Sequence, residues 1–264
     1  IRESMIFYFS GTGNTRWAAE RVAAATGERL ISIADAIGGD CHFDLSSDER
    51  IGFIFPIHGW RPPLLILKFI KKLDITADGH YCYALVTAGD SIGKAMDYLS
   101  VALSPKGLSI DSCFSLIMPE SYVGLPFMDV DIKQREKEKK VKAANDLEEF
   151  IKAIVARRKG LSEIVKGPMP GFFSGPVGAF FFFFLITDRP FHVDRKRCIS
   201  CGKCEKVCPV GDVRMVADGS REFPTWIHNG ECLTCFACYH HCPKKAIDYG
   251  HRTQHKGQYY FKKI

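Results

Sequence analysis

CISCGKCEKVCP, residues 198–209, and CLTCFACYHHCP, residues 232–243, decide how the C-terminal part of this chain folds. Each stretch holds three cysteines at intervals of three residues, then a fourth cysteine four residues on, followed by a proline. The second stretch repeats the spacing of the first 34 residues later. This repetition indicates a site, built twice, that needs several sulfur ligands converging from different directions.

The spacing is the one by which thiolates hold [4Fe–4S] clusters, in which a tight loop supplies three ligands. The fourth cysteine leaves along a short helix and, in proteins with two such runs, binds the other cluster. We therefore predict two clusters, each with three ligands from one run and the fourth from the other. Cluster 1 is assigned to Cys198, Cys201, Cys204 and Cys242, and cluster 2 to Cys232, Cys235, Cys238 and Cys208.

Zinc and disulfides explain these cysteines less well. Structural zinc sites draw their cysteines as separated pairs, which leaves the middle cysteine of each triplet without a role. Disulfides require an oxidising compartment. The remaining cysteines, Cys41, Cys82 and Cys113, lie far from any such motif and are expected to be small apolar side chains. Cluster thiolates without a secretory signal predict a cytoplasmic protein.

The positive charge of the chain is concentrated in its C-terminal part. The 264 residues have a formal net charge of +6. From Thr187 onward there are 14 Lys and Arg and 8 Asp and Glu, so residues 1–186 are neutral. Two oxidised clusters, each with a charge of about −2, would offset most of this excess. We therefore expect no nucleic-acid binding, although basic patches often indicate it.

The N-terminal part begins with a short apolar run, MIFYF at residues 5–9, that predicts a buried strand. A glycine-rich loop and an amphipathic helix, from about Arg16 to Ala25, follow it. This arrangement presents free backbone N–H groups to an anion. No lysine stands in the loop, which excludes a nucleotide P-loop; the alternative is an ordinary turn. The candidate phosphate ligands are Ser10, Gly11, Thr12, Gly13, Asn14 and Thr15.

Further apolar runs at residues 29–33, 50–55, 81–86 and 113–118 alternate with helical patterns, and a long charged helix is expected over residues 131–158. This alternation predicts a doubly wound α/β sheet of five parallel strands. Short strands at residues 191–193, 213–216, 223–227 and 246–249 flank the cysteine runs. They predict a small α+β domain with an internal repeat.

The motif Ser10-x-Thr12-Gly13-x-Thr15 resembles the phosphate loop of flavodoxins, which holds the monophosphate of FMN. The C-terminal cysteine runs are similar to those of ferredoxins with two [4Fe–4S] clusters. In this order, the two parts resemble the flavodoxin–ferredoxin fusion proteins of anaerobic microbes. The resemblance implies a sheet in the order 2-1-3-4-5, bound FMN, and electron transfer. We expect an FMN domain over residues 1–165, a linker over 166–190 and a ferredoxin domain over 191–264.

Loops at the carboxyl edge of such a sheet bind the ligand, and three of them are expected to meet the flavin. Trp60 is placed to lie against the flavin ring or to pack over its own loop. His58 is either a flavin neighbour or an exposed loop residue, and Asp90 either a flavin contact or a helix cap. Flavodoxin relatives carry Pro-x-Asn-Tyr where this chain has Ser121 before Tyr122. The candidates are Pro56, Ile57, His58, Gly59, Trp60, Thr87, Ala88, Gly89, Asp90 and Tyr122.

An apolar segment, Val177 to Ile186, contains five consecutive phenylalanines at residues 180–184. It is too short to span a bilayer, which takes about 20 apolar residues. We expect a strut that seats the cluster domain on the FMN domain. A membrane contact or a surface for a partner protein stays open.

The function predicted from these parts is electron transfer between FMN and two [4Fe–4S] clusters, as a low-potential carrier or adaptor. No catalytic acid–base pair stands out, and the donor and acceptor proteins cannot be identified. Two alternatives stay open. The flavin could reduce a small organic acceptor directly, or the α/β domain could be a flavin-free docking module for the ferredoxin.

Overall fold

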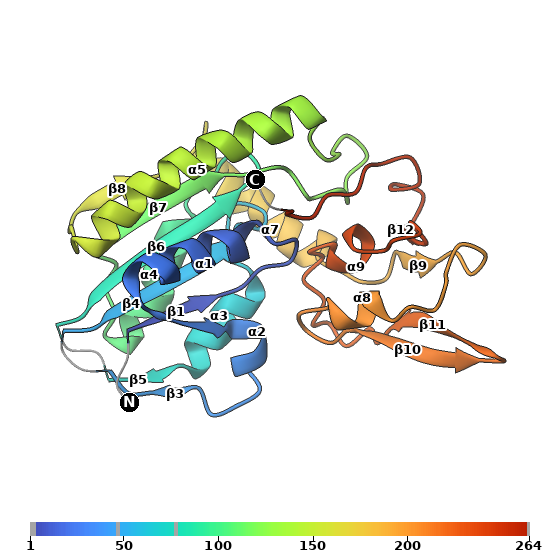
Figure 1. The fold of residues 1–264 in the computed structure, drawn as a ribbon, viewed down its shortest axis with the longest axis horizontal. Coiled ribbons are helices and arrows are strands. Elements are labelled where there is room, and N and C mark those ends of the chain that lie inside the picture. Colours follow the sequence, from blue (N-terminus) through green and yellow to red (C-terminus); the bar gives the residue numbers. More distant parts are fainter. Residues whose placement is uncertain (1–3, 46–47, 77–78, 263–264) are drawn as a thin grey trace.

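The computed structural model describes residues 4–45, 48–76 and 79–262. The outer ends of the two predicted domains, residues 1–3 and 263–264, lie outside the described residues. The N-terminal part of the chain forms a parallel sheet covered by helices, and the cysteine runs form a smaller part beside the sheet (Figure 1). The chain is thus a mixed α/β protein with a small ferredoxin-like C-terminal part.

The central sheet has six strands, so the prediction of five is one strand short. The additional strand is short and has one half-buried leucine followed by two exposed residues, so its sequence contains no apolar run. All neighbours in the sheet pair in parallel, in the order β2-β1-β4-β6-β7-β8. The strands are β1 (Met5–Tyr8), β2 (Arg29–Ser32), β4 (Arg50–Pro56), β6 (Tyr81–Ala88), β7 (Ser112–Ile117) and β8 (Leu161–Glu163).

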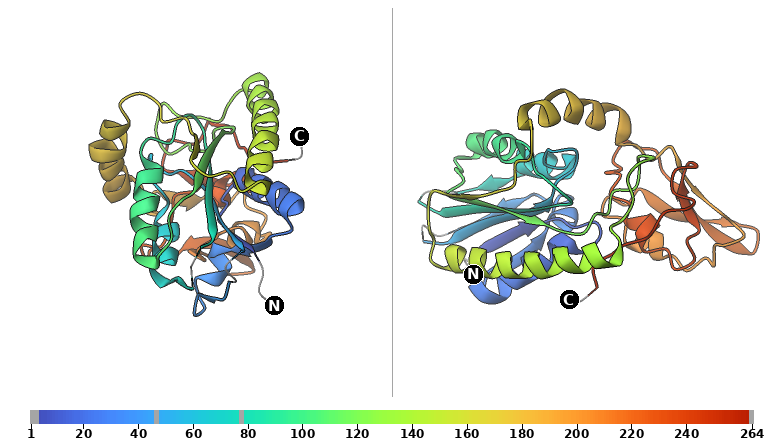
Figure 2. Two further views of the ribbon diagram at one scale, coloured as in Figure 1. Left: turned by 90° about the vertical axis from the view of Figure 1, so that its left-hand side faces the viewer. Right: turned by 90° about the horizontal axis from the view of Figure 1, so that it is seen from above.

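Helices cover both faces of this sheet because its middle strands are apolar on both sides. One apolar core lies between the sheet and α3 and α4, and the other lies between the sheet and α1 and α5. The two helix layers stand on opposite sides of the sheet in Figure 2. The helices are α1 (Asn14–Thr26), α2 (Ile33–Ala36), α3 (Leu64–Lys72), α4 (Ala95–Leu103) and α5 (Lys133–Val155); a two-stranded pair, β3 (His42–Phe43) and β5 (Asp74–Ile75), lies apart from the sheet.

The C-terminal part consists of two antiparallel strand pairs and two single-turn helices. Each helix starts inside a cysteine run, after a residue with positive φ, so the repeat of the sequence is a repeat of structure. Hairpin β10–β11 points away from the large sheet (Figure 1). The elements are β9 (Phe191–Val193), α8 (Lys203–Lys206), β10 (Val213–Asp218), β11 (Arg221–Trp226), α9 (Ala237–His240) and β12 (Ile247–Tyr249).

The segment after β12 returns from the cluster-bearing part to the sheet. The backbone N–H of Phe261 donates to the Thr12 carbonyl oxygen over 2.7 Å, and the Tyr259 hydroxyl donates to Asn14 Oδ1 over 2.6 Å. The ring of Phe261 packs on Trp17 of α1, with centroids 5.3 Å apart. This tail, which carries no recognisable motif, ties the two parts together beside the glycine-rich loop.

The phenylalanine-rich segment is helical. It comprises α6 (Pro170–Phe172), a π-helical turn (Phe173–Val177), α7 (Gly178–Phe180) and a second π-helical turn (Phe181–Leu185). In the right-hand view of Figure 2 it extends beside the sheet toward the C-terminal part. Among the helices of the described residues, none combines the length and apolar character that crossing a membrane requires.

Replacing Tyr259 with Phe is expected to lower the free energy of unfolding of the anaerobically purified protein by about 1–3 kcal/mol, because Asn14 Oδ1 then stays buried without its donor. Asn14 is only 8% exposed. Tyr260→Phe is the matched control, since its hydroxyl has no hydrogen-bond partner among the described residues. Unfolding by denaturant, followed by fluorescence, measures the free energy of unfolding of both variants. Equal stability of the two variants would contradict the role given to the tail.

Candidate functional site

The structure brings each predicted set of four cysteines together around one small cavity. Cys198, Cys201, Cys204 and Cys242 line the first, and Cys208, Cys232, Cys235 and Cys238 line the second. No three His, Cys, Asp or Glu side chains among the described residues are placed to hold a single metal ion. A four-iron cube separates its four thiolates because each one binds a different corner.

Backbone N–H groups point at the sulfurs in the same pattern in both sets. Ser200 N–H donates to Cys198 Sγ and Thr234 N–H to Cys232 Sγ, each over 3.4 Å. After the fourth cysteines, N–H groups donate over 3.2 Å to Cys208 Sγ and to Cys242 Sγ. Such bonds stabilise thiolates and tune cluster potentials. The residues present therefore fit an iron–sulfur cluster in each cavity.

Burial opposes ionisation of the thiols of Cys204 and Cys235 as long as no metal is bound. It raises the pKa of Cys204 to about 11 and the pKa of Cys235 to about 12. A metal-coordinated thiol is deprotonated by the charge of the metal. The sulfurs of Cys204 and Cys235, one in each cavity, therefore become stable thiolates only with a cationic group beside them.

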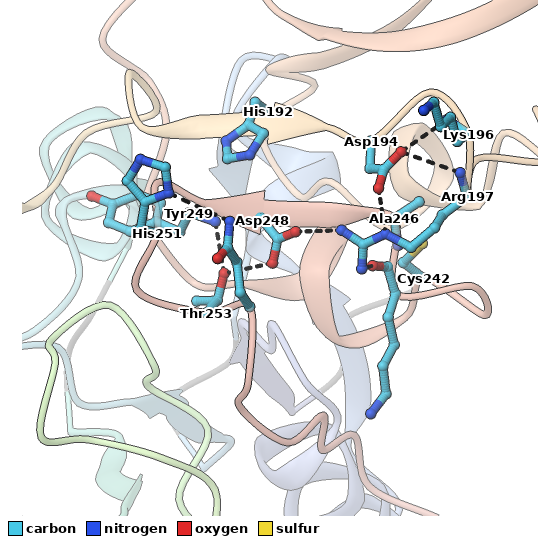
Figure 3. Close-up of polar contacts among 12 residues, drawn as sticks. His192, Asp194, Lys196, Arg197, Cys242, Ala246, Asp248, Tyr249, His251 and Thr253 are labelled. Atoms are coloured by element: carbon cyan, nitrogen blue, oxygen red, sulfur yellow. Dashed lines mark hydrogen bonds and ion pairs between the residues drawn. The ribbon is translucent and has the colours of Figure 1, made fainter.

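Arg197 holds the two halves of cluster 1's site together, as Figure 3 shows. It directly precedes Cys198, and its guanidinium donates to Asp194 over 2.7 Å and to Asp248 over 2.6 Å. It also donates to the Lys245 carbonyl oxygen, three residues after Cys242. Asp248 is 4% exposed, so this ion pair is largely removed from water on its carboxylate side.

A third and larger cavity, of about 620 Å³, lies at the carboxyl edge of the large sheet. It collects the loops after β1, β4, β6 and β7, as expected of an open α/β sheet. Of the residues predicted to bind FMN, all except Gly13 line it. Gly13 instead precedes α1 in a left-handed conformation, with φ of 98°, and a side chain there would meet Phe261.

The glycine-rich loop has free donors for an anion. Gly13 N–H is bonded to Ser10 Oγ over 3.1 Å, but among the described residues no acceptor takes the N–H groups of Gly11, Thr12, Asn14 or Thr15. The last two belong to the first turn of the 13-residue helix α1, whose N-terminus favours negative charge. The side chain of Asn14 is occupied, because it bonds Pro119 O and Tyr259. The loop therefore fits a phosphate group through its backbone.

The other end of the cavity is aromatic and less polar. Trp60 packs on Phe173 with ring centroids 4.8 Å apart, and its indole N–H donates to Ser91 Oγ over 3.3 Å. His58 is half-buried, and desolvation lowers its pKa to about 4, so its ring is neutral at pH 7. Asp90 is exposed and does not cap α4, because Lys94 stands at that cap.

Glu120 is a polar group of the cavity wall that no sequence pattern singles out. It accepts N–H bonds from Ser121 and Tyr122, each over 2.8 Å, and burial raises the pKa of its carboxyl. A side chain at Gly89 would overlap it, so Gly89 must stay small for the two loops to meet. The position of Glu120 in the cavity wall follows only from the folded structure, and no pattern in the sequence indicates it.

The phenylalanine-rich helical segment, residues 170–185, forms a lid over this cavity. Ser174 is fully buried, and its hydroxyl donates to Trp60 O over 3.0 Å while accepting from Lys94 N–H over 2.8 Å. Arg61 donates to the carbonyl oxygens of residues 174 and 175. The lid is therefore more than the strut expected from the sequence. The lining residues of the lid, and those that follow Tyr122 in the loop after β7, were not predicted: Leu125, Phe127, Met128, Phe173, Val177, Phe180, Phe181 and Leu185.

The cavity touches the second cysteine set. Thr234 and Cys235 line its wall, and a methyl group placed on Gly11 would lie 3.0 Å from Cys235 Cβ. The ring of Tyr122 packs edge-on against Phe236, with centroids 5.4 Å apart. None of the cysteines of cluster 1 lines this cavity among the described residues. The two cysteine sets therefore differ in their distance from the flavodoxin-like loops.

Replacing Arg197 with Gln is expected to make cluster 1 several-fold more sensitive to air. The change removes the positive charge beside the buried Asp248, which still accepts from the Thr253 hydroxyl. The expected cost is about 1–3 kcal/mol, since the Arg197 side chain is itself 40% exposed. Arg195→Gln is the matched control, because Arg195 pairs with Asp218 where both side chains are more than half exposed. Loss of absorbance near 400 nm and of iron per chain follows the clusters. Equal rates of loss in the two variants would contradict this role.

Comparisons with known proteins match the C-terminal part most strongly. Residues 191–255 match the family model of a 4Fe-4S dicluster domain. The chain is 38% identical over 56 residues to an uncharacterized ferredoxin of Methanocaldococcus jannaschii, a match that covers 21% of this chain and 70% of that one. It is 45% identical over 51 residues, or 19% of its length, to a component of the ion-translocating oxidoreductase complex of Methanosarcina acetivorans. That match spans only 17% of the relative's own length.

The ferredoxin-type protein NapH of Haemophilus influenzae matches at 28% identity over 25% of this chain and 23% of its own length. A crystal structure of an NADH:FMN oxidoreductase overlaps 64% of this chain and 98% of its own, at 16% identity and a TM-score of 0.36. A flavoprotein structure from Bacteroides uniformis overlaps 44% of this chain and 90% of its own, at 21% identity and a TM-score of 0.31. Likeness of this degree does not place the chain in either protein's family.

The family is instead shown by the archaeal ferredoxin, of which this chain covers 70% at 38% identity. The residues of this chain that match the dicluster domain contain the cysteines around the two small cavities. Electron transfer through iron–sulfur clusters is the chemistry of that domain. Through its C-terminal part this chain belongs to the ferredoxins with a 4Fe-4S dicluster domain, joined here to a flavodoxin-like α/β part.

Proposed function

We propose that this protein transfers electrons between FMN, bound in the large cavity, and two [4Fe–4S] clusters held by the two cysteine sets. It acts as a low-potential redox adaptor. Residues 1–165 form the FMN domain, residues 166–190 the linker that contains the lid, and residues 191–264 the cluster domain. The strand order β2-β1-β4-β6-β7 supports FMN binding by the N-terminal part, since it corresponds to the order 2-1-3-4-5 of flavodoxin-like sheets.

The observation that carries the proposal is the contact between Gly11 and Cys235. Gly11 belongs to the candidate phosphate loop, and Cys235 is a candidate ligand of cluster 2. A side chain at Gly11 would crowd this approach, since a Cβ there would lie 3.0 Å from Cys235 Cβ and 3.4 Å from its sulfur. Electrons would therefore pass between the cavity and cluster 2 first, and reach cluster 1 through cluster 2.

FMN would supply chemistry that no side chain offers, because it exchanges two electrons whereas each cluster exchanges one. The chain's own residues orient it and keep water out. The free N–H groups of the glycine-rich loop would bind its phosphate, and Trp60, His58 and Tyr122 would contact its ring. The lid excludes solvent from the ring end through Phe173, Phe181 and Leu185.

A second candidate function is reduction of a small organic acceptor beside the flavin. The apolar side chains of Leu125, Met128 and Phe180 in the cavity wall favour it, because they would contact an apolar acceptor. Steady turnover of a quinone or nitro compound with reduced ferredoxin and no other protein would support this function over that of a carrier.

The order of transfer is tested by removing one cluster at a time. With Cys201→Ser, which removes a ligand of cluster 1, light-driven reduction of bound FMN is expected to bleach the remaining cluster as fast as in the wild type. With Cys235→Ser the rate is expected to fall at least tenfold, because the cluster next to Gly11 is lost or altered. Flash photolysis with absorbance detection measures both rates, and iron analysis shows which clusters remain.

Gly11→Ala provides a second variant that keeps all eight cysteines. It is expected to slow the same transfer, because the loop and Cys235 must separate to admit the methyl group. Unchanged rates in both Gly11→Ala and Cys235→Ser would show that electrons do not pass through cluster 2 first.

A further inference from the structure

The two cluster cavities differ in charge. The cavity of cluster 1 is lined by Lys203 and Lys244. The cavity of cluster 2 has Asp212 in its wall and, among the described residues, no lysine or arginine. The basic excess of the C-terminal part is therefore not shared equally between the two clusters.

The two sites also differ in exposure. Cys201 is exposed, and its neighbour Ile199 is 52% exposed at the edge of the cavity of cluster 1. Cys235, in contrast, lies against Gly11 of the α/β part. A protein in solution can therefore approach cluster 1 at its edge, whereas one side of cluster 2 is covered by the chain itself.

The lysines near cluster 1 are not neutralised by carboxylates. The arginines of this region are paired, Arg195 with Asp218 and Arg197 with Asp194 and Asp248. Glu205 accepts a bond from the backbone N–H of residue 215. The lysines that line or flank the site are exposed and enter no ion pair among the described residues: Lys196, Lys203, Lys206, Lys244 and Lys245.

Their charge exceeds that of the cluster they surround. An oxidised four-iron cluster with four thiolates has a charge of about −2. Arg197 with its two carboxylates, together with Glu205, adds a further −2, so the five lysines leave the region with a net charge of about +1. Clusters of one sign of charge raise association rates with oppositely charged partners, and they do so less at high salt. The lysines lie at the exposed edge of cluster 1. They would therefore attract an acidic protein whose own redox centre must come close to that cluster for electron transfer.

We propose that the surface formed by Ile199, Cys201, Lys203 and Lys244, here called the cluster-1 face, docks an acidic one-electron carrier protein. This inference rests on the proposed electron-transfer function and adds the place and the charge of the partner. In each encounter one electron moves from the reduced centre of the carrier to oxidised cluster 1. The carrier is oxidised by one electron and the cluster reduced by one, and no bond or proton needs to move.

The test compares charge reversal at this face with the same reversal elsewhere. The test variant is Lys203→Glu with Lys244→Glu. The matched control is Lys71→Glu with Lys137→Glu, two exposed lysines of α3 and α5 that enter no ion pair among the described residues. Stopped-flow absorbance gives the second-order rate of electron transfer from a reduced, acidic two-cluster ferredoxin, at 20 mM and 500 mM NaCl. A reduced viologen, which is small and cationic, reports whether cluster 1 is still intact.

In the wild type, the rate with the acidic ferredoxin is expected to fall at least tenfold between the two salt concentrations. At low salt the test variant should lose at least tenfold in rate, while the control variant stays within about twofold of the wild type. Reduction by the viologen should not slow in either variant. A test variant that matches the wild type with the ferredoxin would overturn the docking surface.

Two further outcomes separate this proposal from the one on which it rests. If acidic and basic carriers reduce the wild type equally fast at every salt concentration, the docking surface is wrong and electron transfer stands. If no carrier reduces clusters that the viologen reduces, the docking surface and the electron-transfer function are both wrong.

A membrane is the alternative occupant of the cluster-1 face. If the test variant loses binding to phosphatidylserine vesicles but keeps its rate with the ferredoxin, the face binds membranes and the proposal fails.

Discussion

The close approach of Gly11 to Cys235 is the contact on which the rest of the structure depends. It joins the first loop of the large sheet to the second cysteine run, two segments more than 220 residues apart in the sequence. A glycine allows this approach without any displacement, since a Cβ there would lie 3.0 Å from the Cβ of the cysteine. Because the same cysteine lines the large cavity, a group bound in that cavity and a cluster at Cys235 would be neighbours.

Several other interactions hold this contact in place. The buried ring of His240 accepts a bond from Tyr259 N–H over 3.0 Å, and its other nitrogen lies 2.7 Å from the Ser121 carbonyl oxygen. Lys256 donates to the Val123 carbonyl oxygen over 2.9 Å. The tail, the loop after β7 and the helix that follows Cys235 thus form one hydrogen-bonded layer. This layer fixes the cluster-bearing part against the sheet, so a transfer path between them does not depend on a flexible linker.

Much of this could be predicted from the sequence, for a physical reason. Three of the four predicted ligands of each cluster lie close together in the chain, so the spacing of Cys198, Cys201 and Cys204 carries most of the geometry of that site. Strands such as Tyr81–Ala88 are mostly apolar because both faces are buried. The short strand Leu161–Glu163 lacks such a run and was missed. The lid, Glu120 and the tail were also missed, because their roles arise from contacts between segments that no local pattern encodes.

The central claim is that cluster 2 lies beside the flavin and cluster 1 lies beyond it. Crystals of the anaerobically purified protein, supplied with FMN and measured at the iron absorption edge, test it most directly. Two four-iron clusters are expected, one of them bound by Cys235 next to Gly11. The FMN phosphate is expected on the N–H groups of Gly11, Thr12, Asn14 and Thr15. Flavin bound elsewhere, or iron bound by Cys201 lying nearer to the flavin than iron bound by Cys235, would contradict it.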